Sequence, residues 1–108
     1  MAYDHDLAAD VRAQLAGEAD ITEKAMFGGL AFMAGGRMAV VVSGQGGLML
    51  RVRPDETEAL LALEHTRPME MRGRDMNGWI RVDPAGCADD DALHQWVDRG
   101  LRAAAAAR

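Results

Sequence analysis

The sequence contains one cysteine, Cys87, and three histidines, which are scattered at positions 5, 65 and 94. A lone cysteine cannot form an internal disulfide bond, and the positions of the histidines match no spacing of zinc ligands. No apolar run approaches the roughly 20 residues of a membrane-spanning helix. The acidic start, residues 1–6, lacks the basic and apolar segments of a secretory signal. We therefore expect a cytoplasmic protein that holds no metal and no cofactor.

Basic residues are outnumbered, with 12 lysines and arginines against 17 aspartates and glutamates, so the formal net charge is -5. This balance argues against nonspecific binding to nucleic acids, which needs clustered basic side chains. The acids concentrate in residues 1–23 and 83–108, whereas residues 24–82 hold a slight excess of bases. If helices from both ends of the chain lie on one face of the molecule, that face will be acidic.

The length of 108 residues and the 49% hydrophobic content fit one domain, residues 1–108, with a core that needs no disulfide. Apolar residues at helical spacing predict helices over residues 3–17, 54–65 and 89–101. The alanines at 103–107 would extend the last helix through their intrinsic propensity alone.

Strands are predicted in two blocks, residues 24–53 and 69–82, because apolar runs there are separated by glycine-rich turns. The predicted order is therefore helix, three or four strands, helix, two strands, helix. Strands that follow one another directly favour a mainly antiparallel sheet in an α+β fold. The helices would cover one face of the sheet, and the other face would be solvated or used for binding.

Residues 24–33 place two apolar runs around a pair of glycines. Glycine within a strand pattern marks a bulge, a bend or a close approach of two backbones, so we predict a structural rather than a ligand-binding role. The apolar run at residues 38–42 predicts a strand that is covered on both faces. The predicted structural motif consists of Met26, Phe27, Gly28, Gly29 and Gly78.

The sequence shows no catalytic constellation. Cys87 precedes an acidic stretch that would raise its pKa and lower its reactivity. The histidines, His5, His65 and His94, have ordinary interpretations as surface or helix-end residues. The segment 44–47 joins two strands and lacks the lysine and the following helix of a phosphate-binding loop, so it predicts a hairpin turn. We expect that the protein is not an enzyme, and keep a small-ligand or enzymatic function as the second alternative.

The central arginines offer a binding surface. Arg51 and Arg53 share one face of a strand by period two, and two further arginines flank Gly73 in a turn. Without a partner, these side chains would form a solvated face with ion pairs at its rim. The predicted partner-binding residues are Arg51, Arg53, Arg72, Arg74 and Trp79. Binding of nucleic acid through the central arginines is the first alternative.

Two segments carry the most specific pattern, Lys24-x-Met26-Phe27-Gly28-Gly29-Leu30-Ala31-Phe32-Met33 and Gly73-Arg74-x-Met76-x-Gly78-Trp79. Weaker matches are Gly47–Val52, Arg67-Pro68-Met69 and Trp96-Val97. Together they resemble the N-terminal domain of the TfoX/Sxy family of bacterial competence regulators. The resemblance runs from about Tyr3 to Leu101, so we expect a stand-alone domain without the C-terminal helical domain of longer relatives.

The resemblance implies an α-β(3)-α-β(2)-α fold like that of the type III secretion chaperones. It also implies a regulatory, non-enzymatic role, since full-length relatives promote the expression of competence genes alongside the cyclic-AMP receptor protein. Some short relatives carry an RNA methyltransferase label, for which this chain has no cofactor loop. We therefore predict a protein-binding regulatory domain. We also predict a homodimer, because a small sheet with one uncovered face often finds a partner.

Overall fold

The structure is a computed structural model that describes residues 3–26 and 28–107. Within these residues, six strands form one antiparallel sheet in the order β1-β2-β3-β4-β6-β5. The strands are β1 (Ile21–Met26), β2 (Gly29–Ala34), β3 (Arg37–Val42), β4 (Leu48–Arg51), β5 (Thr66–Met71) and β6 (Arg74–Val82). The predicted α+β class with a mainly antiparallel sheet is confirmed.

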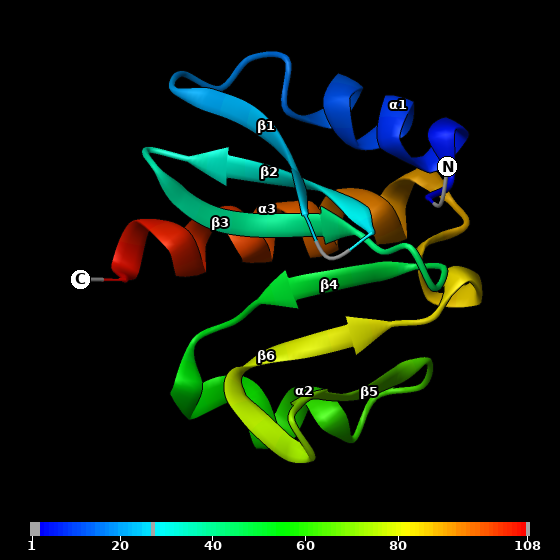
Figure 1. The fold of residues 1–108 in the computed structure, drawn as a ribbon, viewed down its shortest axis with the longest axis vertical. Helices are drawn as coiled ribbons and strands as arrows, with labels where there is room; N and C mark the ends of the chain where they lie inside the picture. The colour runs from blue at the N-terminus through cyan, green and yellow to red at the C-terminus, as the bar shows by residue number, and fades with distance from the viewer. Residues whose placement is uncertain (1–2, 27, 108) are drawn as a thin grey trace.

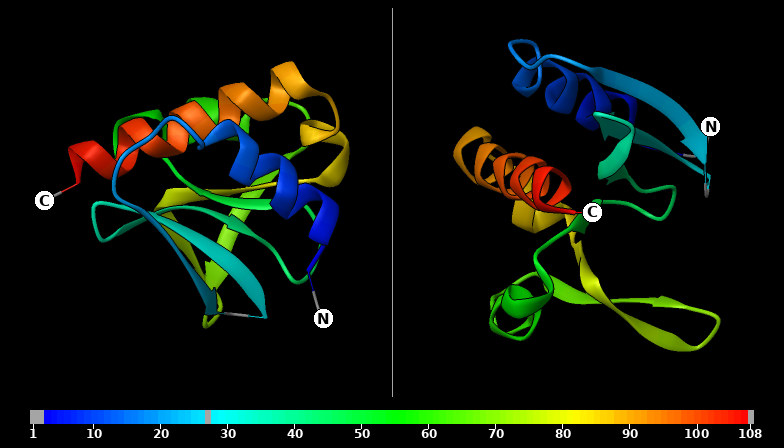
Figure 2. Two further views of the ribbon diagram at one scale, coloured as in Figure 1. Left: turned by 90° about the horizontal axis from the view of Figure 1, so that it is seen from above. Right: turned by 90° about the vertical axis from the view of Figure 1, so that its left-hand side faces the viewer.

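The helices all lie on one side of this sheet, as Figure 1 and Figure 2 show. They are α1 (His5–Gln14), α2 (Thr57–Leu61) and α3 (Asp90–Ala106), and short 3₁₀ turns η1 (Pro54–Glu56) and η2 (Pro84–Cys87) precede the last two. The expectation that helices cover one face of the sheet is therefore confirmed.

The glycine pair separates two strands. Gly28 has a φ of 72° in the connection from β1 to β2, and Met26 pairs with Gly29 across the hairpin. A Cβ atom on Gly29 would clash with the carbonyl oxygen of Val42 on β3, so this position also needs glycine. Four strands consequently precede α2, the larger of the two numbers predicted and one more than the family resemblance implied. Phe27 lies outside the described residues.

The main core lies between the sheet and the helices. Side chains of β2, β3, β4 and β6 point to this side, and apolar side chains of α1, α2 and α3 pack onto them. The buried members from the strands are Leu30, Phe32, Ala39, Val40, Val42, Leu48, Leu50, Ile80 and Val82, and those from the helices are Ala8, Val11, Leu60, Leu93, Val97 and Ala104.

The two long helices begin at aspartate caps. The Asp4 carboxylate accepts hydrogen bonds from the backbone N–H groups of Asp6 and Leu7, and the Asp89 carboxylate accepts one from Ala92 at 2.8 Å. At its other end, α3 buries two residues of the alanine segment 103–107 against the sheet. The expectation that this segment is helical through propensity alone was wrong, because tertiary packing also holds it.

The second predicted helix is shorter than the sequence indicated. It ends at Leu61 rather than near His65. The Thr66 hydroxyl lies within hydrogen-bond distance of the carbonyl oxygens of Leu60 and Leu63, and β5 begins at Thr66. Gly78, a member of the predicted structural motif, lies within β6, which continues through it. Gly78 has a φ of 90°, and its N–H donates to the Thr57 hydroxyl at 3.1 Å. Its structural role is therefore to join β6 to the start of α2.

Candidate functional site

A second apolar cluster lies on the sheet face opposite the helices. We call this surface the open face. Five of the chain's eight methionines gather there. The buried members of the cluster are Ala31, Val41, Met49 and Met69, and the partly buried members around them are Met26, Met33, Met38 and Trp79.

The strand register makes this cluster continuous. Ala31 of β2 pairs with Val41 of β3, which in turn pairs with Met49 of β4. Met33 and Met38 face each other across β2 and β3 in the same way. Residues that are paired across neighbouring strands point to the same side of a sheet, so these side chains form one patch.

The open face carries no helical layer in the part of the chain that the structure describes (Figure 2). Val41 is nevertheless fully buried, because the surrounding methionine side chains pack over it. The prediction that the strand at residues 38–42 is covered on both faces is therefore correct at Val41. On the open face, side chains rather than helices cover this residue. In the right-hand view of Figure 2, the β1–β2 and β5–β6 ends of the sheet reach away from the helices, and the open face lies between them.

Arg51 and Trp79 border the methionine cluster. They form a cross-strand pair between β4 and β6, and the Arg51 guanidinium lies 4.8 Å from the centre of the Trp79 ring. The Nε–H group of Arg51 donates to the Met38 carbonyl oxygen at 2.7 Å, which fixes the side chain across β3. Burial lowers the pKa of Arg51, and the like charge of Arg37 lowers it further.

Further cations lie beside the cluster. Arg67 of β5 and Arg81 of β6 are paired across the sheet, and Lys24 of β1 is paired with Ala31. Burial lowers the pKa of Arg81, with a smaller contribution of the same sign from Arg67 and an opposing one from Asp83. Arg67 is neutralised by Asp83, whose carboxylate oxygen lies 2.7 Å from its guanidinium. The open face therefore combines an apolar centre with partly desolvated positive charge.

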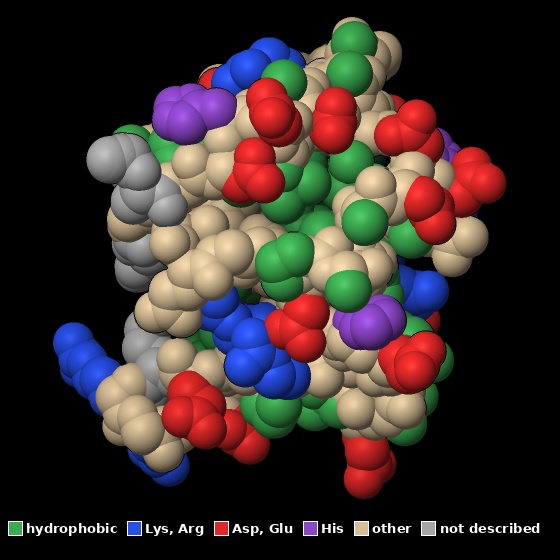
Figure 3. Space-filling model, turned by 90° about the vertical axis from the view of Figure 1, so that its right-hand side faces the viewer, with side chains coloured by type: hydrophobic (Ala, Val, Ile, Leu, Met, Phe, Trp, Pro, Cys, Tyr) green, Lys and Arg blue, Asp and Glu red, His purple; other side chains and the backbone are tan. Residues whose placement is uncertain are grey.

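The helical side has the opposite charge. The carboxylates of residues 1–23 and 83–108 lie mainly on and beside α1 and α3, which pack next to each other on that side. In Figure 3 the densest group of acidic side chains covers the helical half of the view at the upper right. The sequence-based expectation of an acidic helical face is confirmed.

The structure places the five predicted contact residues in different regions. Arg51 and Trp79 are together on the open face. Arg53 lies outside the methionine cluster, because β4 ends at Arg51 and the chain turns into η1. It nevertheless lines one cleft together with Arg51 and Trp79, and its guanidinium lies 3.4 Å from Asp55. Arg72 and Arg74 are exposed at the turn between β5 and β6.

The methionines of the open face were missed as a group by the sequence reasoning. The signal was available at one point, because Met49 shares the face of Arg51 by the same period of two that placed Arg51 outward. It was not available for the rest, since the partners of β4 follow from the strand order and not from local pattern.

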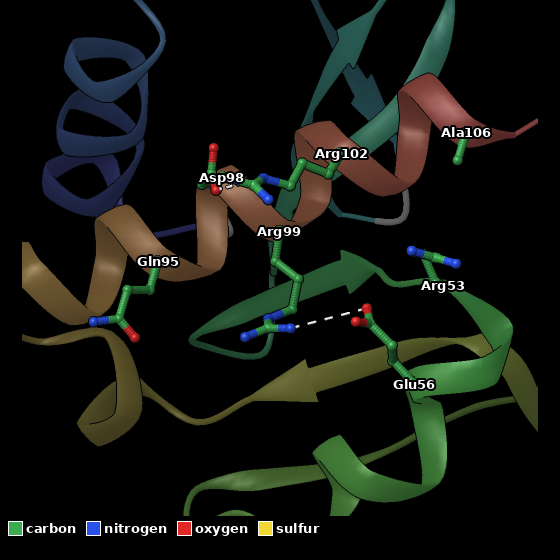
Figure 4. Close-up of a pocket in the computed structure, with 7 residues that line it drawn as sticks. All are labelled: Arg53, Glu56, Gln95, Asp98, Arg99, Arg102 and Ala106. Atoms are coloured by element: carbon green, nitrogen blue, oxygen red, sulfur yellow. Dashed lines mark ion pairs between the residues drawn. The ribbon is translucent and has the colours of Figure 1, made fainter.

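A polar cleft of about 330 Å³ lies between α3 and η1 (Figure 4). Two ion pairs cross its lining, Arg99 with Glu56 at 3.9 Å and Arg102 with Asp98 at 2.8 Å. Positive and negative side chains are thus interleaved, with three arginines against two carboxylates in the lining. Its lining residues are Arg53, Glu56, Gln95, Asp98, Arg99, Arg102 and Ala106.

Cys87 is unsuited to nucleophilic chemistry. Its side chain is buried, and its Sγ atom lies 3.7 Å from the carbonyl oxygens of Asp83 and Pro84. Burial raises the pKa of Cys87 to about 11, and the charges of Asp4 and Asp83 act in the same direction, so the reactive thiolate is scarce at neutral pH.

The histidines are exposed, and His94 lies 2.9 Å from the Gln14 side chain. In residues 3–26 and 28–107, the carboxylate, histidine and cysteine side chains form no group that could hold a metal ion. The described helices also include none that is long and apolar enough to cross a membrane.

Comparison with protein families gives one match, to the TfoX N-terminal domain, over residues 13–104. Searches of curated proteins and of solved structures gave no match. The matched range includes β1 to β6 and nearly all of α3, and therefore the whole open face. The chain belongs to the family of TfoX N-terminal domains.

Proposed function

We propose that this domain is a regulatory protein-binding module and that the open face is its docking surface. The observation that carries the proposal is the methionine cluster on the face opposite α1, α2 and α3. The TfoX N-terminal family is not a known enzyme family, and a regulatory role is plausible for its members. The relatives that the sequence resembles regulate the transcription of competence genes. We include a role in the same process in this proposal.

The composition of the open face supports protein docking. Methionine, tryptophan and arginine are enriched at the centres of protein–protein interfaces relative to the rest of protein surfaces. Methionine has a flexible and polarisable side chain, so a methionine-lined surface can adapt its shape to a partner. Trp79 adds a large aromatic surface whose position is fixed by the stacked guanidinium of Arg51.

The alternatives have less support. Nucleic-acid binding through the central arginines would draw on positive charge gathered in one place, whereas Arg51 and Arg53 line one cleft and Arg72 and Arg74 lie at a hairpin turn. Catalysis by a thiol nucleophile would draw on a reactive side chain, and the raised pKa of Cys87 opposes that use.

The proposal is tested by affinity capture from the protein's own cells with two variants that add the same charge. Met33→Glu places a carboxylate within the open face, and Leu63→Glu places one at a residue that is 49% exposed outside it. We expect proteins that are retained by the wild type and by Leu63→Glu to be lost from Met33→Glu. Retention of the same proteins by all three chains, each shown to be folded by circular dichroism, would overturn the proposal.

A further inference from the structure

We infer that the partner segment that docks on the open face is acidic, with an apolar stripe flanked by aspartate or glutamate side chains. The inference rests on the proposed function, because it names the class of partner for the same surface. It follows from the positive charges that border the methionine cluster and from how they are satisfied.

Arg51 and Arg81 are the charges that matter most. Both are partly buried beside the cluster, and among the described residues neither forms an ion pair. One N–H of Arg51 is used by the Met38 carbonyl and one of Arg81 by the Ser43 hydroxyl, while each guanidinium carries further donors. Both keep hydrogen-bonding capacity next to an apolar surface.

A docked partner must accept hydrogen bonds from the remaining N–H groups of Arg51 and Arg81. An apolar or basic partner would remove water from Arg51 and Arg81 without replacing its hydrogen bonds, which is unfavourable for charged groups. A carboxylate would supply charge-assisted hydrogen bonds to the same guanidinium groups. It would also offset the like-charge repulsion that Arg51 experiences from Arg37 and Arg81 from Arg67.

A second copy of the chain does not meet this requirement. A two-fold interface between two open faces would bring the same arginines from both copies together, and like charges across an interface are strongly unfavourable. The homodimer predicted from the sequence therefore needs another surface, and the exposed outer edge of β1 is the one that an antiparallel pairing of strands would use.

A nucleic acid also fits less well than an acidic protein segment. Its phosphates would reach Arg51 and Arg81, but the strand would cross a centre made of methionine, alanine and valine. Binding of single strands relies on several aromatic platforms, and among residues 3–26 and 28–107 the cluster contains one aromatic side chain, Trp79. An acidic segment with an apolar stripe would contact the methionine cluster through the stripe and Arg51 and Arg81 through its carboxylates.

The test uses the full chain labelled with ¹³C at the methionine methyl groups. Two helix-forming peptides of about 18 residues share one leucine stripe and differ only in a polar face of glutamate or of lysine. We expect the glutamate peptide to shift the methyl signals of Met33, Met38 and Met49. The signal of Met76, which lies outside the methionine cluster in a cleft lined by Thr57, Leu61 and Trp79, should move less than these three.

The affinity for the glutamate peptide should exceed that for the lysine peptide about tenfold at low salt, and the ratio should fall as salt is added. Reversing two charges in Arg51→Glu/Arg81→Glu should invert the preference, whereas Arg102→Glu on the exposed surface of α3 should leave it unchanged. The comparison of the two peptides on the wild-type chain needs no variant, so it decides the question even if the double variant fails to fold.

Results of three kinds, the last of which includes two outcomes, would overturn the inference. The first is equal or tighter binding of the lysine peptide, which would leave the docking surface in place with another partner class. The second is methyl shifts produced by a single-stranded oligonucleotide of about 12 nucleotides at lower concentration than by the glutamate peptide. The third is shifts that depend on protein concentration alone or the absence of any shift. In each case the capture experiment with Met33→Glu decides separately whether the open face docks a protein.

Discussion

The two faces of the sheet are built from the same strands but from different kinds of side chain. The face under the helices is filled by branched and aromatic residues such as Phe32, Val40 and Leu50, each almost fully buried. The open face is filled largely by methionines, several of them only partly buried. Branched and aromatic side chains have well-defined rotamers, whereas methionine does not, so the two faces differ in how firmly they specify one packing.

This difference separates folding from binding. The helical face supplies most of the buried apolar surface that holds the fold together, and the open face keeps a smaller cluster that a partner could rearrange. Phe32 and Met33 show the division most simply, since they are neighbours on β2 and point to opposite faces.

The largest expected effect compares these two neighbours. Phe32→Ala should lower the free energy of unfolding by about 3–5 kcal/mol, because it leaves a cavity under the helices. Met33→Ala should lower it by about 1 kcal/mol or less, because its side chain is partly solvated and the site can collapse. Urea unfolding measures both values. A loss at Met33 as large as that at Phe32 would show that the open face is a second structural core.

The buried thiol under the helices should make stability fall at high pH. The fold raises the pKa of Cys87 from 9.0 to about 11, so between these values the unfolded chain releases a proton that the folded chain retains. Unfolding therefore becomes more favourable as pH rises through this range, and the melting temperature should drop by roughly 5–10 °C more than in Cys87→Ala. Identical melting curves against pH for the two chains would contradict the burial of this thiol.

Removing the cap of α3 should weaken the helical face modestly. Asp89→Ala loses the carboxylate that accepts from the Ala92 N–H and should lower the free energy of unfolding by about 1 kcal/mol. Asp89→Asn keeps an acceptor and should recover most of this loss. Asp91→Ala, in the same exposed first turn, serves as the control and should change stability by a few tenths of a kcal/mol.

The smallest expected effect lies on the open face. A double-mutant cycle of Arg51→Ala and Trp79→Ala should give a coupling energy of about 0.5–1 kcal/mol, the range for a cation that stacks on an aromatic ring near the surface. The single Arg51→Ala change should reduce binding of the acidic peptide far more than it reduces stability. A coupling energy near zero would mean that the guanidinium of Arg51 does not hold the Trp79 ring in place.

The sequence predicted those features that depend on local pattern. The period of two placed Arg51 on the correct face of β4, and the predicted range of the last helix starts at its N-cap residue, Asp89. The ends of elements were less predictable where a distant contact decides them. The end of α2 depends on the Thr66 hydroxyl, and the packing of alanines 103–107 depends on the sheet beneath them.

The candidate site was predicted only in part for the same reason. Arg51 and Trp79 were selected individually, but their stacking depends on β4 lying next to β6. Arg53 was placed on the same face by extending a period beyond the end of the strand, where the backbone turns into η1. Methionine occurs both in cores and on binding surfaces, so the residue type alone does not predict its location. The strand order is needed to show which methionines share the open face.

Methionine oxidation tests the central claim most directly. The domain is cross-linked to its partner in its own cells, exposed to hydroxyl radicals, and compared with the isolated domain by mass spectrometry. Docking on the open face predicts that Met26, Met33 and Met38 become protected in the complex, while Met76, which lies outside the methionine cluster, is protected less. Unchanged oxidation of the first three methionines, with protection confined to residues elsewhere on the molecule, would contradict the account.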